Sequence, residues 1–427
     1  MRTHTAAEVA NLEDGEKVVL GGWVDSVREH KDIKFLILRD RTGTCQITAK
    51  KGEVDDSIFS SVSTLIKESV VLVDGIVKRS EKTVRGAEVL PKKIEILSVS
   101  EKILPLDQNV ESNLDTRLQW RFLDFRNPKT KAIFNIQHSI LKAFRNFFYE
   151  RDFIEMQPPI IISSASEGGA ELFPLNYFDR KAYLAQSPQL YKQMGALSFE
   201  KVFMISPVFR AEKFDQPTHL NEIRQMDAEI AFADDQMAMQ LLEDCFLHIL
   251  NSVQYHNKED LKLLGVDLKI PEAPLKRITY SQAIQMLKDE GETIMEGDDF
   301  TKMQEALLTR KIGVPFFIYD WPAELKAFYA VPKPNSNLVK AYDLIYGGIE
   351  ISSGTQRVND PELLKKKIAE KGLNPKNFEY YIDCFRFGAP PHAGWSIGLE
   401  RLTMALIGAK NIRECTMFPR DRTRLEP

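Results

Sequence analysis

The sequence predicts an α+β protein that has a small N-terminal β-barrel and a larger C-terminal domain built on a largely antiparallel sheet. Three observations lead to this expectation. Its 427 residues exceed a comfortable single hydrophobic core. The first hundred residues alternate as short strands, and the remainder mixes strand-like runs with helices. Because these later elements lack regular βαβ alternation, a mixed sheet is favoured over a parallel one.

The N-terminal strands read VVLGGWV, IKFLILRD, TCQIT, SVVLVDGIVK and EVLPKKIEIL. A helix-like stretch, SIFSSVSTLIKES, lies between the third and the fourth. Five strands with one inserted helix suggest an OB-type barrel, a fold often used for single-stranded nucleic acid. The same pattern fits other small barrels. We expect this domain to cover residues 1–104.

The next segment, residues 105–130, is predicted to be a hinge. The stretch LPLDQNVESNLDTR, from Leu104 to Arg117, is polar and lacks periodicity. A long amphipathic helix should follow, because apolar residues from Ile133 to Phe147 recur at helical spacing. This helix should end before Pro158, since proline cannot donate a backbone hydrogen bond.

Residues 131–427 are predicted to form the second domain, an antiparallel sheet flanked by helices. Its strand-like runs are EKVFMISPVFRAE, QMDAEIAFAD, VPFFIYDWP, KAYDLIYGGIEISSG and GWSIG. Helix-like stretches between and after them include QMAMQLLEDCFLHILNSVQYH and LERLTMALIGA.

Composition excludes several classes of protein. Hydrophobic residues make up 43% and no apolar run is long enough for a bilayer, so we expect no membrane span. The polar, acidic N-terminus argues against a targeting signal, and we expect a cytoplasmic protein. The four cysteines form no CxxC pair and predict neither a zinc site nor a disulfide framework. A net charge of -4 excludes a polyanion-binding tail as the main feature.

Three clusters place charged residues within apolar strands, where charges need partners. The first is VFRAEKFDQPTHLNEIRQMDAEIAF, in which Arg210, Glu212, His219 and Asp227 flank a polar loop. A guanidinium presents a fixed fork of donors to a phosphate, so Arg210 is a candidate anion ligand. The competing interpretation is an Arg–Glu ladder on an exposed hairpin.

The second cluster, AYDLIYGGIEISSGTQR, holds Asp343, Glu350 and Arg357. The glycines permit a turn or bulge that brings the two carboxylates together, which would suit a magnesium ion shared with phosphates. They could equally be ordinary acids beside a turn. In the third cluster, HAGWSIGLERL, glycines allow close ligand approach and Arg401 at a helix start favours anion binding.

In this order the clusters resemble the motifs of class II aminoacyl-tRNA synthetases, and the resemblance covers nearly the whole chain. The helix ending in IEMQPPI resembles the dimer-forming first motif, FRAE with DAE the second, and GWSIGLERL the third. An OB-like barrel in front points to the subgroup that activates aspartate, asparagine or lysine. QSPQLYKQ resembles the signature of the aspartyl members, and FPRDRTRLEP resembles their archaeal and eukaryotic type.

The resemblance implies an ATP-dependent aspartate–tRNA ligase, a homodimer that acts on tRNA for aspartate and leaves tRNA for asparagine open as a second acceptor. Lys192 and Arg357 would hold the side-chain carboxylate of L-aspartate. Gln189, Asp227 and Glu167 would surround its α-amino group.

The resemblance further implies that Arg210 binds the α-phosphate of ATP and Arg401 the γ-phosphate, both acting in catalysis. The other implied roles are the adenosine side for Glu212, the phosphates for His219, ATP and Mg2+ for Glu350, Mg2+ for Asp343 and Ser353, and the anticodon for Arg28, Phe35 and Gln46. For Phe35 the competing interpretation is barrel core, since Ile33 and Ile37 share its face. The chain departs from the family at Ile223, where many members stack an aromatic ring on adenine.

Three alternatives remain open from the sequence. The first is an asparaginyl-tRNA synthetase of the same architecture, against which QSPQLYKQ speaks. The second is a paralogue that keeps the fold without charging tRNA, which the retained charged residues disfavour. The third is an asparagine synthetase related to the larger domain, which would have no use for the barrel.

Overall fold

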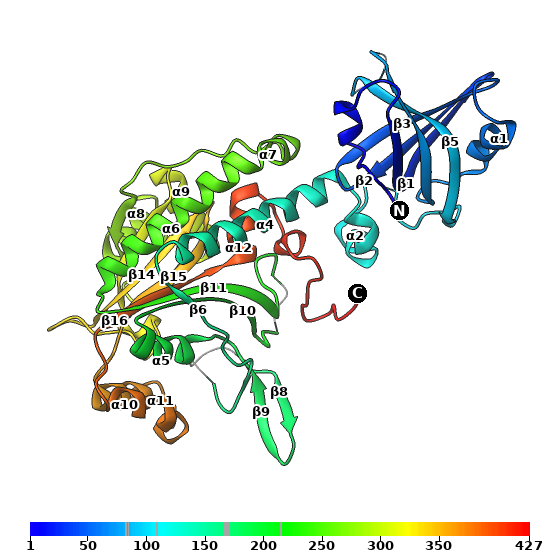
Figure 1. Ribbon diagram of the computed structural model, residues 1–427. Coiled ribbons are helices and arrows are strands. Elements are labelled where there is room, and N and C mark those ends of the chain that lie inside the picture. The colour runs from blue at the N-terminus through cyan, green and yellow to red at the C-terminus, as the bar shows by residue number, and fades with distance from the viewer. Residues whose placement is uncertain (82, 84, 108–109, 166–170, 214–215) are drawn as a thin grey trace. The chain divides into compact units, whose positions relative to one another are not determined.

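The computed structural model describes residues 1–81, 83, 85–107, 110–165, 171–213 and 216–427. It divides into two compact units, Met1–Asp107 and Gln108–Pro427 (Figure 1). Each unit has its own hydrophobic core.

The first unit is a closed barrel of five strands in the order β1-β2-β3-β5-β4. Its elements are η1 (Glu8–Asn11), β1 (Lys17–His30), β2 (Ile33–Asp40), β3 (Gly43–Lys50), α1 (Asp56–Thr64), β4 (Val70–Arg79) and β5 (Ala87–Ser98). Helix α1 lies between the third and fourth strands, so the predicted OB-type barrel is confirmed.

The second unit is built on an eight-stranded sheet in the order β12-β13-β14-β15-β16-β11-β10-β6. Its strands are β6 (Ile154–Glu155), β10 (Lys201–Phe209), β11 (Glu222–Ala231), β12 (Lys276–Thr279), β13 (Phe316–Pro322), β14 (Leu338–Tyr346), β15 (Ile349–Arg357) and β16 (His392–Gly398). The pairs β12–β13 and β6–β10 are parallel and the other pairs are antiparallel. The sheet is therefore largely antiparallel, as the sequence predicts. A small sheet contains β7 (Ile161–Ile162), β8 (Pro174–Tyr177) and β9 (Arg180–Leu184).

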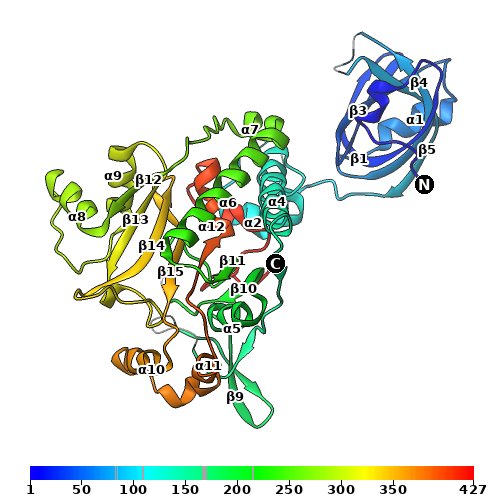
Figure 2. The same cartoon turned by 60° about the vertical axis from the view of Figure 1, so that its left-hand side comes forward.

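Helices α4, α6 and α12 cover one face of the large sheet (Figures 1 and 2). The helices of the second unit are α2 (Leu114–Gln119), α3 (Arg121–Asp124), α4 (Pro128–Tyr149), α5 (Gln189–Phe199), α6 (Asp235–His256), α7 (Lys258–Leu264), α8 (Tyr280–Asp289), α9 (Lys302–Ile312), α10 (Pro361–Glu370), α11 (Glu379–Phe385) and α12 (Leu399–Ile407), with short 3-10 turns η2 (Ala323–Leu325), η3 (Pro375–Phe378) and η4 (Ile412–Cys415). Within the described ranges, no helix combines the length and apolar character that a bilayer span requires.

Helix α4 illustrates why the sequence forms these elements. It starts at Pro128 in the first turn, with the Asn127 side chain accepting a hydrogen bond from a first-turn amide. Its apolar stripe, including Ile140 and Phe144, packs against the sheet. The helix ends at Tyr149, before Pro158, as the sequence predicts.

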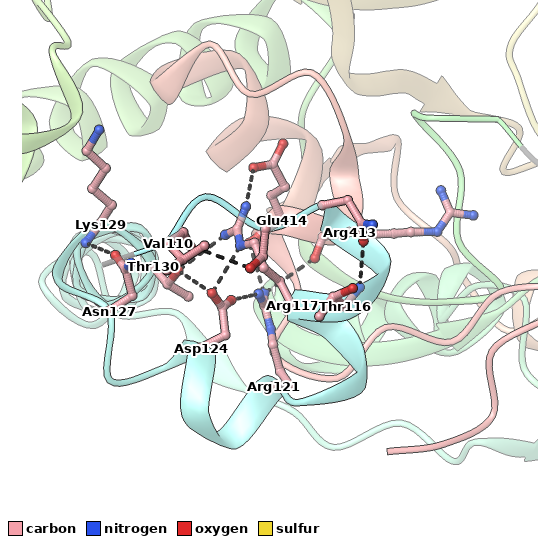
Figure 3. Close-up of polar contacts among 12 residues, drawn as sticks. Val110, Thr116, Arg117, Arg121, Asp124, Asn127, Lys129, Thr130, Arg413 and Glu414 are labelled. Atoms are coloured by element: carbon pink, nitrogen blue, oxygen red, sulfur yellow. Dashed lines mark hydrogen bonds and ion pairs between the residues drawn. The ribbon is translucent and has the colours of Figure 1, made fainter. Parts of the chain in front are cut away.

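Residues 105–130, expected to form a hinge, contain α2 and α3, which are packed within the second unit by a buried arginine. The Arg121 guanidinium donates to the carbonyl oxygens of Met417 at 3.0 Å and Thr416 at 2.8 Å. It also pairs with Asp124 at 2.5 Å, and Asp124 in turn accepts from Arg117 (Figure 3). These bonds hold the first part of residues 413–424, the C-terminal segment, against α3.

Candidate active site

The predicted site residues that the structure describes in the second unit converge on the face of the large sheet opposite α4 and α6. Strand alternation explains this: Met226 and Ala228 of β11 point into the core, so Gln225, Asp227 and Glu229 point to the other side, called the front face. Side chains of directly paired residues share a face.

Strand register aligns four polar residues in one row on the front face. Three of them, Asp227, Ser353 and Asp343, are predicted site residues, and the fourth is Ser396. Asp227 pairs with Ser396, Ser396 with Ser353, and Ser353 with Asp343. These residues come from four adjacent strands and from the three separate sequence clusters. The sheet therefore brings together what the sequence separates.

A pocket opens on this face. Six residues predicted for ATP or metal binding line it, namely Arg210, Glu212, His219, Glu350, Ser353 and Arg401. Ile223, the residue at the expected adenine-stacking position, lines it as well, together with Leu220 and Ile412. The pocket thus combines an apolar wall with several charges.

The loop between β10 and β11 is held in place by Asn221, a residue that the sequence did not single out. Its side-chain amide donates to the carbonyl oxygens of Arg210 at 2.6 Å and Glu212 at 3.2 Å. The C-terminal segment braces the same loop, because the Asn221 backbone amide donates to the Arg420 carbonyl at 2.8 Å. The Arg210 Nε atom is buried and has no hydrogen-bond partner among the described atoms, so it is available to a ligand.

Cations control the electrostatics of this pocket. Burial and then the charges of Arg401, Lys302 and Arg210 lower the pKa of His219 to about 4. His219 is therefore neutral at pH 7 in the free protein. Arg401 lies at the start of α12, with Nη1 3.4 Å from the carbonyl oxygen of Glu350 and 4.0 Å from its carboxylate.

Glu400 also lines the pocket and was missed by the sequence analysis. It is almost fully buried, and its two oxygens lie 3.1 and 3.2 Å from the Arg224 backbone amide, which donates to them. Burial raises the pKa of this carboxyl to about 7. No local sequence signal reports this burial, because it depends on how α12 packs against β11.

The expected bend between the two carboxylates of the second cluster is present. Gly347 and Gly348 adopt φ values of +60° and +85°, and a bulge interrupts the β14–β15 pairing after Leu344. Burial raises the pKa of Asp343 to about 6, and the neighbouring Glu350 contributes in the same direction. The two acids are therefore close enough to interact.

These residues fit a magnesium ion that is shared with a ligand. One oxygen of Asp343 binds Lys326 at 2.5 Å, while the buried Oδ1 atom has no hydrogen-bond partner among the described atoms. Within the described ranges, no group of three or more His, Cys, Asp or Glu side chains could hold a metal alone. Two carboxylates and the Ser353 hydroxyl suit magnesium when phosphate oxygens complete its coordination.

Beside the pocket, two buried cations lie on the front face with Glu229, a carboxylate that the sequence analysis missed. Lys192 of α5 donates to Asp227 Oδ1 at 2.8 Å and lies 3.7 Å from Glu229. Arg357 binds Glu229 through Nε at 2.8 Å and Nη2 at 3.0 Å, leaving Nη1 outside this pair. Although burial opposes ionisation, Arg357 and Lys192 hold the pKa of Glu229 below its ordinary value. The alternation in QMDAEIAF could have revealed Glu229, which lies two residues beyond Asp227.

Unsatisfied polar atoms surround these cations. Among the described residues, Gln189 Nε2, Gln193 Nε2, Asp227 Oδ2 and Ser396 Oγ are buried without a hydrogen-bond partner. Buried polar groups are nearly always bonded, so the arrangement indicates a polar ligand. Glu167, the remaining residue predicted here, lies outside the described residues.

The three barrel residues lie on one outer surface. Phe35 pairs directly with the exposed Arg28, whereas its neighbours Leu36 and Leu38 fill the barrel core. The competing interpretation of Phe35 as core is therefore wrong. Gln46, opposite Ile37, donates from its amide to Glu88 at 2.9 Å. Glu88 was not predicted. Because it accepts from the Gln46 amide nitrogen, the Gln46 carbonyl oxygen points away from it.

Two families match the chain. The family described as tRNA synthetases class II (D, K and N) matches residues 113–422, and the OB-fold nucleic acid binding domain matches residues 18–97. The aspartate–tRNA(Asp/Asn) ligase of Methanocaldococcus jannaschii is 45% identical over all of this chain and 98% of its own length. The aspartate–tRNA(Asp) ligase of Pyrococcus horikoshii is 46% identical over all of both chains. The solved asparaginyl-tRNA synthetase of the same organism, complexed with asparaginyl-adenylate, superposes with a TM-score of 0.93 at 35% identity, covering 97% of each chain.

Proposed function

Because the chain belongs to the class II tRNA synthetases of the D, K and N group, we propose that it activates L-aspartate with ATP and transfers it to tRNA for aspartate. The observation that carries this proposal is the pair of buried cations, Lys192 and Arg357, beside a pocket lined by Arg210 and Arg401. The first pair suits a carboxylate and the second suits phosphates.

In the amino-acid site, Lys192 and Arg357 bind the side-chain carboxylate of aspartate. Glu229 holds both cations in position before the substrate arrives, while Arg357 Nη1 remains outside the Glu229 pair. Gln189, Asp227 and Glu167 surround the α-amino group. Asparagine would bring no charge to these cations, and a buried mismatch of this kind is a strong source of discrimination.

In the nucleotide site, Arg210 binds the α-phosphate, Arg401 the γ-phosphate and Glu212 the adenosine side, with His219 near the phosphates. No protein nucleophile is needed. The aspartate α-carboxylate attacks the α-phosphorus in line and pyrophosphate leaves. The terminal ribose 3′ hydroxyl of tRNA then attacks the adenylate carbonyl and AMP leaves. The residues of the site position the reactants and neutralise charge, which can supply most of the acceleration.

Asp343, Glu350 and Ser353 would hold Mg2+ together with the phosphates of ATP. When bound, the ion supplies positive charge to the triphosphate. Lys326 holds Asp343 in place by its bond to the other carboxylate oxygen.

We assign residues 1–104 to anticodon binding and 131–427 to catalysis. The helices α2 and α3, which lie within the expected hinge 105–130, belong to the second unit. On the barrel, Phe35 offers a ring for stacking an unstacked base, with Arg28 beside it for the backbone. Gln46 reads a base edge, and its bond to Glu88 turns the amide nitrogen inward so that the carbonyl oxygen is left to accept from the base.

We also propose a cytoplasmic homodimer. The exposed apolar residues Tyr149, Ile154 and Ile161 lie at the end of α4 and in the short strands that follow, next to Pro158. A face of this kind is typical of a buried interface. Sedimentation equilibrium should give twice the chain mass, and a monomer at all concentrations would refute dimerisation.

The first experiment is amino-acid-dependent exchange of pyrophosphate into ATP, with aspartate, asparagine and lysine in parallel and without tRNA. We expect exchange with aspartate alone. Exchange with asparagine would instead favour an asparaginyl enzyme, and no exchange with any of the three would favour the non-charging paralogue. Charging of purified transcripts of the two tRNAs, differing in the third anticodon base, then decides whether tRNA for asparagine is a second acceptor.

A further inference from the structure

Helix α9 carries a lysine, linked through Glu305 to the pocket residue Glu350, that neither the sequence motifs nor the proposed function uses. Lys302 is the first residue of α9, where Thr301 and Gln304 form a reciprocal cap. Its side chain is 38% exposed, so a ligand can reach its ammonium group.

The position of Lys302 is fixed by a chain of contacts that leads to the pocket. Its ammonium donates to the two oxygens of Glu305 at 2.9 and 2.8 Å. Glu305, which is buried, also accepts from the backbone amide of Glu350 at 3.3 Å. Glu350 lines the pocket and contacts Arg401. The Glu305 carboxylate therefore joins Lys302 to Glu350. Glu350 in turn lies beside Arg401, the arginine assigned to the γ-phosphate.

The charge of Lys302 acts on the pocket. It is the second of the three cations that lower the pKa of His219, after Arg401 and before Arg210. An ammonium group has three donors, and Glu305 takes two of them. One donor is left for another acceptor, and its charge adds to those of Arg401 and Arg210, which also act on His219.

Building on the proposed function, we propose that Lys302 binds the terminal phosphates of ATP and the pyrophosphate released from it. Glu305 is its positioning residue. Glu305 restrains the flexible lysine stem before the ligand arrives, which reduces the conformational entropy lost on binding.

The test measures KM for ATP and for pyrophosphate in the exchange reaction, in the wild type, Lys302→Met and Lys302→Arg. A lost hydrogen bond between charged groups predicts that both KM values rise about tenfold in Lys302→Met. The KM for aspartate and the inhibition constant of AMP, which lacks the terminal phosphates, should not change. Lys302→Arg should stay near the wild type.

Lys311→Met is the matched control, because Lys311 lies on the same helix and pairs with Glu290. If Lys302→Met and Lys311→Met give the same KM for ATP and pyrophosphate, the inference is wrong. An equal loss of AMP binding in Lys302→Met would also overturn it, since the effect would then reach the whole pocket. If the wild type shows no exchange, the proposed function fails, and calorimetric titration of the same proteins with ATP and pyrophosphate still tests Lys302.

Discussion

Lys192 is a buried ammonium group shared by two carboxylates, Asp227 and Glu229, and by the carbonyl oxygen of Trp395. Removing its charge leaves two buried anions and one cation, Arg357. Loss of one partner of a buried ion pair typically costs about 3 to 5 kcal/mol. The charge of Lys192 is therefore important both for the fold of the site and for binding an acidic substrate.

For Lys192→Met we expect KM for aspartate to rise by roughly a hundredfold or more, because one of two cations facing the carboxylate is lost. KM for ATP should change little, since Lys192 does not line the nucleotide pocket. Exchange kinetics measure both values, with Lys366→Met on the exposed side of α10 as the control. Unchanged aspartate kinetics would refute the assignment of Lys192 to the substrate carboxylate.

Glu400 gives a pH dependence of stability. Its pKa is raised from 4.5 to about 7, so the folded protein keeps a proton that the unfolded chain releases. The contribution of the protonated Glu400 carboxyl to the free energy of unfolding is fully present below pH 4.5 and is lost as the pH rises through 7. Relative to Glu400→Gln, the wild type should lose on the order of 3 kcal/mol of unfolding free energy over this interval.

Urea unfolding of the wild type and Glu400→Gln at several pH values measures this difference. The exposed Glu259→Gln variant on α7 serves as the control, for which the difference should stay near zero. If the free energy of unfolding fell equally with rising pH in the wild type and in Glu400→Gln, Glu400 would not be protonated in the folded state.

At the scale of elements, α3 and the C-terminal segment form one structure around Arg121. This guanidinium satisfies carbonyl oxygens of the segment, and its carbon lies 5.2 Å from the ring centroids of Phe125 and of Phe134. The segment also bonds to the loop that carries Arg210, through Asn221 and through a bond from Arg422 to the Lys213 carbonyl at 2.7 Å. Arg121 therefore affects the nucleotide site through the segment.

In Arg121→Met we expect unfolding free energy to fall by about 3 to 5 kcal/mol, because buried carbonyls and Asp124 lose their partner. We also expect KM for ATP to rise more than KM for aspartate, since the braced loop lies in the nucleotide pocket. Denaturant unfolding and exchange kinetics test the two effects, with Arg145→Met on α4 as a more exposed control. Equal changes in both KM values would argue against specific bracing of the loop.

The elements themselves were largely predictable. Hydrophobic periodicity located the barrel strands, α4 and the strands of the large sheet, and proline placed the end of α4 on the correct side of Pro158. Residues that act through long-range packing were not predictable in the same way. Lys302 and Lys326 lie far in sequence from the pocket, and Glu400 is unusual only because of its burial. Glu229 belonged to a recognised pattern, but its pairing with Arg357 depends on strand order.

For the whole molecule, the division into two compact units separates two kinds of recognition. Phe35 lies on the barrel, whereas all the residues assigned to adenylate formation lie in the second unit. Phe35→Ala should therefore reduce tRNA charging, with a loss of about 1 to 3 kcal/mol for one stacked base. Pyrophosphate exchange without tRNA should remain at the wild-type level.

The control is Ile96→Ala, which removes an exposed apolar side chain elsewhere on the barrel. Comparison of kcat/KM for charging with the exchange rate separates the two steps in both variants. If Phe35→Ala lowered exchange as much as charging, the ring would have a structural role in the chain rather than a role in contacting tRNA.

The row formed by Asp227, Ser396, Ser353 and Asp343 also limits how the gene can change in length. Because side chains alternate along a strand, inserting one codon within β11 would turn Asp227 toward the phenylalanine-rich core and Met226 toward the substrate. The same holds for the three neighbouring strands. Insertions and deletions in descendants of this gene should therefore accumulate in the connections between strands, for example between α7 and β12, while the spacing within each of the four strands stays fixed.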